Sequence, residues 1–324
     1  MKSNPISLVS IIIPVYNTGE YLEEVLDSCL QQTYTNIEVI GVDNNSTDKS
    51  REILTKYSKN YPDKIKVFSE TEPGAPAARN KGLKEAEGDY IYFLDADDVL
   101  VENAICLLIA EINNEIDAVC GSEIYYRDHF FGSPQYERKR VRNIDYQLVD
   151  ILNNHPNTGA LLLKKSVIKN VRWNNSLGAG QELVFWSELV LTNNVKIKYI
   201  PETVCKIRIH KSPYRISNKN RKVRIYNHYL AILRIDQLFK SSPYKSPQAE
   251  IALNDRKLRH AFNAIHARNF RVSYLTVKMV NKKLVKKSTN FKWFSKEGAY
   301  YLSNLYIGFL FYFLNNKVRK GIRL

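Results

Sequence analysis

The sequence predicts an α/β fold in which a mostly parallel sheet carries helices on both faces. Short apolar runs alternate with helical segments of roughly ten to fifteen residues along the N-terminal third of the chain, a pattern typical of such a sheet. Acidic residues come directly after two of these runs, at the strand ends where sheets of this kind bind ligands. One pattern therefore predicts both the fold class and the place of a site.

Each expected element rests on its periodicity and its boundary residues. The first strand, 9–17, is apolar up to Pro14, which lacks the N–H that a central strand needs and should end it. The elements that follow are a helix at 19–32, a strand at 37–42, a helix through residue 57, a strand at 65–68, a helix at 75–86 and a strand at 90–94. Ser46 or Thr47 is the expected cap of the second helix.

Acidic residues at two strand ends predict a metal site. Asp43 ends one strand, and Asp95, Asp97 and Asp98 follow the strand at 90–94. Carboxylates held this close repel one another, and a bound divalent cation would remove that cost. Hard oxygen ligands favour Mg²⁺ or Mn²⁺. The alternative is an ordinary charged loop, but parallel strands would bring Asp43 and the three aspartates to one edge, which favours a site.

Four sequence blocks occur in a fixed order, at residues 9–17, 42–48, 73–83 and 95–98. In this order they resemble the motifs of the family 2 glycosyltransferases, whose nucleotide-sugar-binding fold is called GT-A. Weaker matches at 158–165 and 180–186 extend the resemblance, and no family motif is visible from about residue 220 onward. The resemblance implies a GT-A fold and sugar transfer from a nucleotide-sugar donor.

Carried over by position, the resemblance implies a donor site. The backbone around Pro14 and Tyr16, together with the Asp43 carboxylate, would hold the nucleotide base, because the ring N–H of uracil needs an acceptor. Arg79 would lie near the nucleotide or the diphosphate, and the alternative is an arginine on the helix surface. Asp95 would contact the ribose or join the metal shell.

The resemblance also implies a metal ion, Mn²⁺ or Mg²⁺. Asp97 would bind it between the two donor phosphates, where it would neutralise charge on the leaving nucleoside diphosphate. His210 would contact the diphosphate or the metal shell. The alternative for His210 is an ordinary histidine at the end of a strand.

The expected catalytic base departs from the family pattern. Family members carry Glu-Asp where this sequence has Gln181 and Glu182. The resemblance implies that Glu182 takes the proton of an acceptor hydroxyl, and with one acid fewer beside it, repulsion should raise its pKa less. The alternative is an exposed glutamate in the first turn of a helix, where the helix dipole favours it. Asn44, where many members carry a second Asp, is compatible with the base pocket.

Charge is divided unevenly along the chain. Residues 206–324 hold 27 Lys and Arg against 4 Asp and Glu, a net of +23, whereas residues 1–205 hold 21 against 29, a net of −8. We expect a GT-A glycosyltransferase domain at 1–215 and a basic, aromatic-rich helical region at 216–324. The asymmetry favours contact with an anionic partner.

The aromatic residues near the end of the chain favour a membrane surface as that partner. Residues 292–314 are rich in Tyr, Phe and Trp and precede a basic segment, which suits a helix lying in an anionic membrane interface better than a spanning one. The alternative is a terminal helix that packs on the domain. Upstream, 221–239 and 249–287 are expected helices, with these packing positions: Leu230, Leu233 and Leu238 against Ile251, Leu258 and Phe262.

The four cysteines, Cys29, Cys106, Cys120 and Cys205, have no close paired spacing. They are expected to be buried thiols, and they indicate neither a disulfide framework nor a zinc site. The start of the chain is short and polar, which predicts no signal peptide and a cytoplasmic location.

The functional expectation is an inverting glycosyltransferase that moves a sugar from a nucleoside-diphosphate donor, expected to be a UDP sugar, to a saccharide acceptor. The acceptor is expected to be lipid-linked, in the assembly of a bacterial surface glycan, with the enzyme peripheral on the inner face of the membrane. One alternative on the same fold transfers a sugar phosphate or polyol phosphate. A remote alternative is an inactive GT-A domain with a polyanion-binding tail, although the sequence shows no nucleic-acid-binding motif and no nucleic acid is expected.

Overall fold

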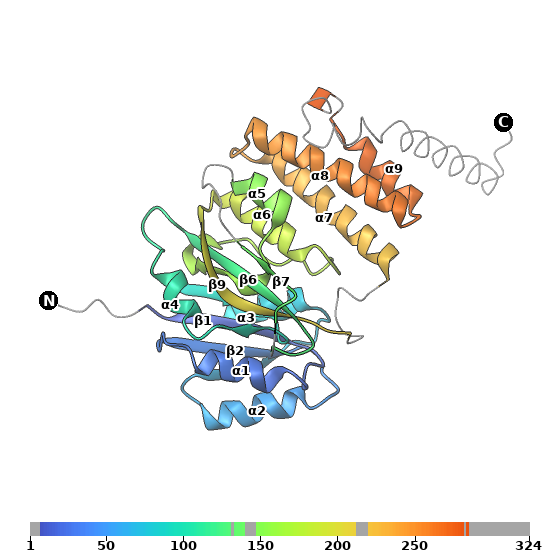
Figure 1. Ribbon diagram of the computed structural model, residues 1–324. Coiled ribbons are helices and arrows are strands. Elements are labelled where there is room, and N and C mark those ends of the chain that lie inside the picture. The colour runs from blue at the N-terminus through green and yellow to red at the C-terminus, as the bar shows by residue number, and fades with distance from the viewer. Residues whose placement is uncertain (1–6, 131–132, 140–146, 212–219, 282, 285–324) are drawn as a thin grey trace. The chain divides into compact units, whose positions relative to one another are not determined.

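The computed structural model describes residues 7–130, 133–139, 147–211, 220–281 and 283–284. Within them, nine strands form one sheet (Figure 1). The strands are β1 Val9–Val15, β2 Ile37–Asp43, β3 Ile65–Ser69, β4 Tyr90–Phe93, β5 Val99–Leu100, β6 Ala118–Arg127, β7 Tyr136–Arg138, β8 Leu161–Lys164 and β9 Ile197–Ile209. Their order in the sheet is β3-β2-β1-β4-β8-β6-β9-β5, with β7 paired to β6.

The N-terminal part of the sheet, β3-β2-β1-β4, is entirely parallel, as predicted. The antiparallel strand β8 joins it to β6, which runs parallel to β9. The expected end of the first strand at Pro14 is wrong, because β1 continues to Val15. Pro14 is tolerated there because pairing with β4 has already ended at Ile12 opposite Phe93, so no ladder bond needs its missing N–H.

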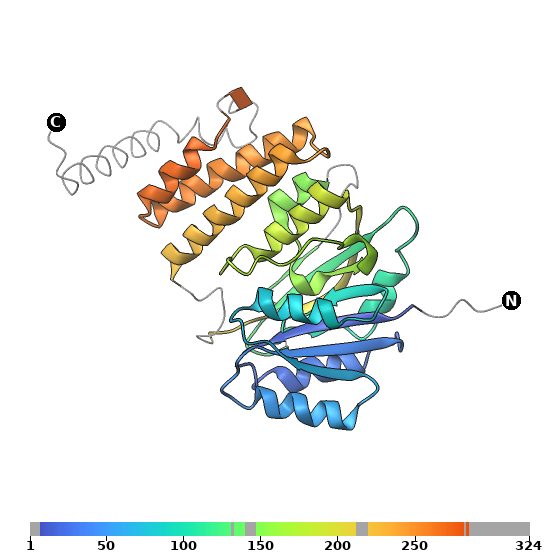
Figure 2. The same ribbon diagram turned by 180° about the vertical axis from the view of Figure 1, so that it is seen from behind.

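Helices cover both faces of this sheet (Figures 1 and 2). The helices of the N-terminal unit are α1 Leu22–Leu30, α2 Ser50–Asn60, α3 Ala75–Glu85, α4 Ala104–Ile109, α5 Gln147–Asn154 and α6 Gln181–Asn193, with 3-10 turns η2 Thr158–Ala160 and η3 Lys165–Val167. α1, α2 and α4 share one apolar core with one side of the strands. On the opposite face, Gly82 of α3 lies against Ile12 of β1, and Phe185 of α6 lies against Phe93 of β4.

The start of α2 corrects the expected cap. Ser46 and Thr47 do not cap this helix, which begins at Ser50 after Lys49. Instead, the Asp48 carboxylate accepts from the Ser50 N–H at 2.9 Å. The Ser46 hydroxyl accepts from the backbone N–H of Asn17 at 3.2 Å. The side chain that was expected to cap α2 therefore binds the loop after β1.

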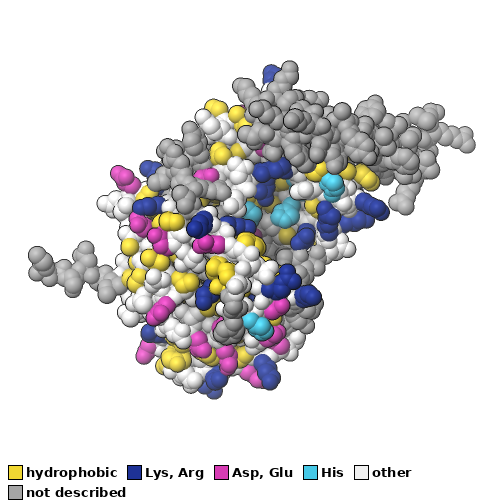
Figure 3. Space-filling model, in the orientation of Figure 1, with side chains coloured by type: hydrophobic (Ala, Val, Ile, Leu, Met, Phe, Trp, Pro, Cys, Tyr) yellow, Lys and Arg dark blue, Asp and Glu magenta, His cyan; other side chains and the backbone are white. Residues whose placement is uncertain are grey.

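The chain divides into two compact units, Met1–Asn218 and Lys219–Leu324. The described helices of the second unit are α7 Arg221–Ser241, α8 Pro247–His266 and α9 Phe270–Lys278. The expected single helix at 249–287 is wrong: Arg268 has a φ of 53°, and the Asn269 side chain accepts from the Val272 N–H at 3.3 Å to cap a new helix. Lys, Arg and His side chains gather on the surface of this unit (Figure 3).

The leucines expected to pack α7 against α8 are not among the buried residues of α7. The buried residues of α7 are Ile225, Ala231, Ile232, Ile235, Asp236 and Phe239, and the expected leucines Leu230, Leu233 and Leu238 are only partly buried. Residues 285–324, which include the expected membrane-surface helix, lie outside the described residues. None of the described helices has both the length and the apolar character needed to cross a bilayer.

The cysteines are free thiols, and Cys29, Cys120 and Cys205 are buried as expected. The expectation is wrong for Cys106, which is partly exposed on α4. Burial raises the pKa of the Cys29 thiol to about 12, so this residue is an inert part of the core.

Candidate active site

The predicted donor-site residues lie at the carboxyl ends of the parallel strands. Asp43 is the last residue of β2, opposite Val15 of β1, and it is 4% exposed. Tyr16 follows β1 and is 45% exposed. A hydrogen bond of 2.7 Å from the Thr47 N–H to the Asn17 side chain joins the two loops. The sheet therefore brings one buried carboxylate and one exposed aromatic ring to the same edge.

The hydrogen bonds of Asn44 give a reason why this chain has Asn where many family members carry a second Asp. Its side-chain NH₂ donates to the carbonyls of Glu70 and Glu72, at 2.9 and 2.7 Å, and its oxygen accepts from the Gly74 N–H at 2.7 Å. A carboxylate has no donors for the first two bonds. The amide thus fixes the turn that leads into α3.

Three aspartates form the only candidate metal cluster in the described part of the chain. Asp95, Asp97 and Asp98 each offer a carboxylate oxygen, and these oxygens all lie within 4.8 Å of one another. Such a set of hard oxygen donors fits a divalent cation of the Mg²⁺ or Mn²⁺ type. Asp98 is buried and one of its oxygens accepts a backbone N–H at 2.9 Å, which leaves Asp95 and Asp97 as the more accessible pair.

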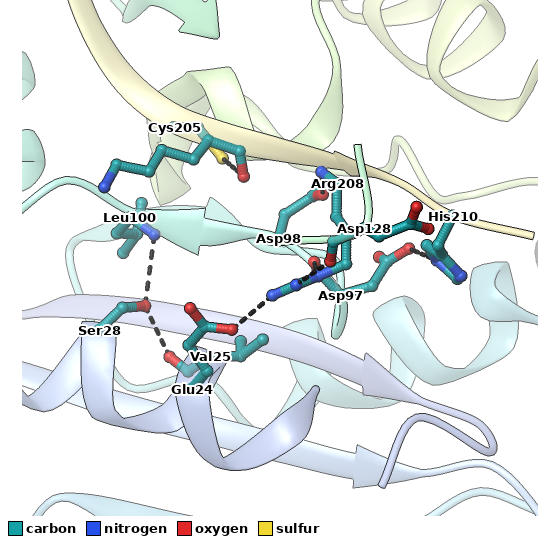
Figure 4. Close-up of polar contacts among 11 residues, drawn as sticks. Glu24, Val25, Ser28, Asp97, Asp98, Leu100, Asp128, Cys205, Arg208 and His210 are labelled. Carbon is teal, nitrogen blue, oxygen red and sulfur yellow. Dashed lines mark hydrogen bonds and ion pairs between the residues drawn. The ribbon is translucent and has the colours of Figure 1, made fainter. Parts of the chain in front are cut away.

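His210 comes next to this cluster from the C-terminal end of β9 (Figure 4). Its Nε2 lies 2.7 Å from the Asp97 Oδ2, and its ring packs on Tyr21 with centroids 4.8 Å apart. The structure therefore joins His210 to Asp97, although 113 positions separate them in sequence.

Arg79 is buried, so the surface position considered as its alternative is wrong. Its Nη2 lies 2.6 Å from the Asp95 Oδ1, and its Nη1 donates to the Gln181 Oε1 at 2.9 Å. The guanidinium also lies over the Trp173 ring, 4.6 Å from its centroid. One cation thus connects α3, the end of β4 and the start of α6.

Glu182 shares this charged environment at the start of α6. A left-handed Gly180, with a φ of 74°, precedes the helix and sets its direction. Burial raises the pKa of the Glu182 carboxyl, Arg79 lowers it and Asp95 raises it. The alternative of an exposed glutamate is wrong, since the side chain is partly buried, and desolvation outweighs the repulsion expected from the sequence.

Sequence reasoning missed Arg208. This residue is 2% exposed on β9 and contacts the Asp97 and Asp98 segment directly (Figure 4). Arg208 and His210 are two residues apart, so they project from the same face of an extended strand. The two-residue spacing is visible in the sequence, but the burial of Arg208 and its contact with a turn 110 positions earlier are not.

Comparisons with known proteins agree with this architecture. The sequence model described as glycosyl transferase family 2 matches residues 10–172. A glycosyltransferase of Rickettsia typhi is 32% identical over 65% of this chain and 67% of its own length. The minor teichoic acid biosynthesis protein GgaB of Bacillus subtilis is 34% identical over 53% of this chain but only 20% of its own length.

Two solved structures share the fold at low sequence identity. TarS 1–349 of S. aureus, in complex with UDP-GlcNAc, aligns with a TM-score of 0.72 at 18% identity over 97% of this chain and 92% of that chain. The mannosyltransferase PcManGT of Pyrobaculum calidifontis, in complex with GDP-Man and Mn²⁺, aligns with a TM-score of 0.60 at 18% identity over 90% of this chain and 84% of that chain.

Proposed function

Because the chain belongs to glycosyltransferase family 2, we propose that it transfers a sugar from a nucleoside-diphosphate donor, a UDP sugar, to a saccharide acceptor with inversion at the anomeric carbon. The observation that carries this proposal is the grouping of Asp95, Arg79 and Glu182 at one edge of the sheet. This grouping supports Glu182 as the base, beside an aspartate turn that would bind the donor diphosphate through a divalent cation.

The donor site in this proposal uses the strand ends. The Asp43 carboxylate and the backbone around Pro14 and Tyr16 bind the base, and Arg79 acts by holding Asp95 rather than by reaching outward. Asp97, with Asp95 and His210, would hold Mn²⁺ or Mg²⁺. The metal-bound PcManGT supports a divalent cation by analogy only. When bound, such an ion neutralises charge on the leaving diphosphate.

The transfer itself is a single displacement. The acceptor hydroxyl oxygen forms a bond to the anomeric carbon while the bond from that carbon to the diphosphate oxygen breaks. Glu182 takes the hydroxyl proton, and the nucleoside diphosphate leaves with the bonding electron pair. A pKa raised by burial makes this carboxylate a stronger base than an exposed glutamate.

We further propose that the acceptor is lipid-linked and that the enzyme works on the cytoplasmic face of an anionic membrane. The net charge of +23 over residues 206–324 supports this, because basic segments bind anionic lipid surfaces. The name of GgaB, a teichoic acid biosynthesis protein, supports a role in surface glycan assembly.

A panel of nucleotide sugars, screened by thermal shift with Mn²⁺ or with chelator, tests the donor. A ligand that binds the native state raises its melting temperature, so we expect one UDP sugar to stabilise the chain with Mn²⁺ and much less with chelator. Asp97→Ala should abolish the Mn²⁺-dependent part of this increase in melting temperature. Asp63→Ala is the control, because Asp63 is exposed.

Two outcomes would contradict the proposal. Equal stabilisation in chelator would remove the metal from donor binding. Release of nucleoside monophosphate instead of diphosphate from an intact donor would indicate transfer of a sugar phosphate, the alternative reaction on this fold.

A further inference from the structure

Arg208 is one of the largest fully buried side chains of the described structure, at 2% exposure. It lies one residue before the end of β9, opposite Tyr126 of β6. A buried guanidinium is costly unless its charge and its N–H groups are satisfied. The hydrogen-bond and ion-pair partners of Arg208 therefore indicate its role.

Arg208 contacts the aspartate turn through both its backbone and its side chain (Figure 4). Its backbone N–H donates to the Asp98 Oδ1 at 2.9 Å, and its Nε donates to the Asp97 carbonyl at 3.0 Å. His210, two residues later, holds the Asp97 Oδ2 at 2.7 Å. The end of β9 thus fixes the main chain of Asp97 and one carboxylate oxygen on each of Asp97 and Asp98.

The other end of the guanidinium is anchored away from the turn. Its Nη2 bonds to the Glu24 Oε2 at 2.5 Å and its Nη1 to the Asp128 carbonyl at 2.6 Å. The Tyr21 and Phe130 rings lie 4.6 and 4.1 Å from it. A planar fork held at three nitrogen atoms and against two aromatic rings cannot rotate freely.

We propose that Arg208 is a positioning residue that shapes the turn of Asp95, Asp97 and Asp98 for its divalent cation. This inference rests on the proposed function, in which that turn holds Mn²⁺ or Mg²⁺. Arg208 touches neither the donor nor the reacting atoms. It acts by fixing the Asp97 main chain, so that the Asp97 carboxylate is ready before the ion arrives.

The sign of the effect separates positioning from simple electrostatics. Arg208 is a cation beside a cation site, so by charge alone its removal should strengthen Mn²⁺ binding. By positioning, its removal should weaken Mn²⁺ binding, and loss of a group that orients a metal ligand typically costs roughly 10–100-fold in affinity. The two roles therefore predict opposite changes.

The test measures Mn²⁺ affinity of the full chain in the presence of UDP, by electron paramagnetic resonance titration. Arg208→Gln removes the charge and the fork, and Arg208→Lys keeps the charge but loses the fork. We expect both variants to weaken Mn²⁺ binding by about 10-fold or more. Arg172→Gln, an arginine of the same unit that bonds only neighbouring carbonyls in the described structure, should match wild type.

A second readout needs no metal. Hydrogen exchange of the peptide that covers the aspartate turn should be faster in both Arg208 variants, while exchange in β1 and β2 stays as in wild type. If Arg208→Gln does not fold, Glu24→Gln loosens the same guanidinium from α1. It should raise both the exchange of the turn and the Mn²⁺ dissociation constant by a smaller factor.

The outcomes are distinguishable. Unchanged or tighter Mn²⁺ binding in both Arg208 variants, with unchanged exchange of the turn, overturns the positioning role and leaves the proposed function intact. Absence of Mn²⁺ binding in the wild-type chain with UDP overturns the metal-dependent function, and the positioning role falls with it.

Discussion

Asn44 makes two hydrogen bonds that an aspartate at this position could not make. Asn44→Asp would turn a carboxylate toward the Glu70 and Glu72 carbonyls. We expect this change to lower the free energy of unfolding by about 1–3 kcal/mol, the cost of leaving buried groups unsatisfied. Urea unfolding measures it, and Asn45→Asp is the control, since the exposed Asn45 makes only longer bonds of 3.2 and 3.4 Å. Equal losses in the two variants would contradict this account.

Glu182 is the residue on which the proposed chemistry depends. Glu182→Gln keeps the shape but cannot take a proton, so we expect the turnover number to fall by on the order of 10²–10⁴ while donor binding stays nearly constant. Glu188→Gln, on the same helix, is the matched control. A Glu182→Gln enzyme within a few-fold of wild type would assign the base elsewhere, and His210 would be tested next.

The pH profile gives a separate check on Glu182. The carboxylate is the active form, and it is lost as the pH falls through the pKa. Burial raises that pKa above the ordinary 4.5. In steady-state rate measurements, the turnover number should therefore already fall at a pH above 4.5 as the solution is made more acidic. A flat profile down to pH 4.5 would contradict a buried base.

The candidate site was predictable from sequence where a motif ends a strand. Asp43 and Asp95 were recognised there because the apolar run of each strand stops where the acidic residue begins. Arg208 was not predictable in the same way, because its role depends on the pairing of β9 with β6 and on the path of a turn about 110 positions earlier. No local pattern encodes such a contact.

At the scale of elements, α7 and α8 bring histidines and arginines together. Desolvation and then Arg256, His260 and Arg224 lower the pKa of His228 to about 4. Desolvation and Arg256 also lower the pKa of His260 to about 4, against a hydrogen bond to the Ile225 carbonyl. These helices therefore hold histidines that stay neutral where unfolded histidines would be charged.

The stability of this unit should depend on pH accordingly. Between pH 6.5 and about 4 the unfolded chain binds protons that the folded chain does not, so stability falls as the pH falls through this window. The effect is on the order of 3 kcal/mol for one such histidine. His228→Gln should flatten the pH dependence of hydrogen exchange in α7 and α8, whereas the exposed His266→Gln should not. An unchanged slope in His228→Gln would contradict the assignment.

The break between α8 and α9 shows why helix ends were the less predictable part. Apolar periodicity continues through the break, so the sequence favoured one long helix. The interruption depends on Arg268 adopting a left-handed conformation without a glycine and on the Asn269 cap. The cap residue Asn269 is a local signal that apolar periodicity alone does not contain.

At the scale of the molecule, the fold class was predictable because four parallel strands lie in the first hundred residues with clear boundaries. The antiparallel insertion of β8 between β4 and β6 was not. It joins segments about seventy positions apart, and nothing in its short apolar sequence specifies a partner.

The division of charge makes a prediction for the whole chain. We expect it to co-sediment with anionic vesicles much better than with neutral ones, and less well as salt shortens the Debye length below about 10 Å. Deleting residues 293–324 should reduce vesicle binding and leave donor binding intact, because the candidate donor and metal residues, His210 included, all precede the deleted segment. Equal sedimentation of the shortened chain would indicate that the tail packs as ordinary core.

The guanidinium of Arg79 has a consequence for how this enzyme can change over time. It joins Asp95, 16 positions away, to Gln181, 102 positions away. Substitutions at these three places should therefore be epistatic, with double-mutant coupling of about 0.5–3 kcal/mol. An acid in place of Gln181 would be buried beside Arg79, so its charge would be compensated only while Arg79 remained. The buried charge of Arg79 would therefore constrain the order in which such mutations arise.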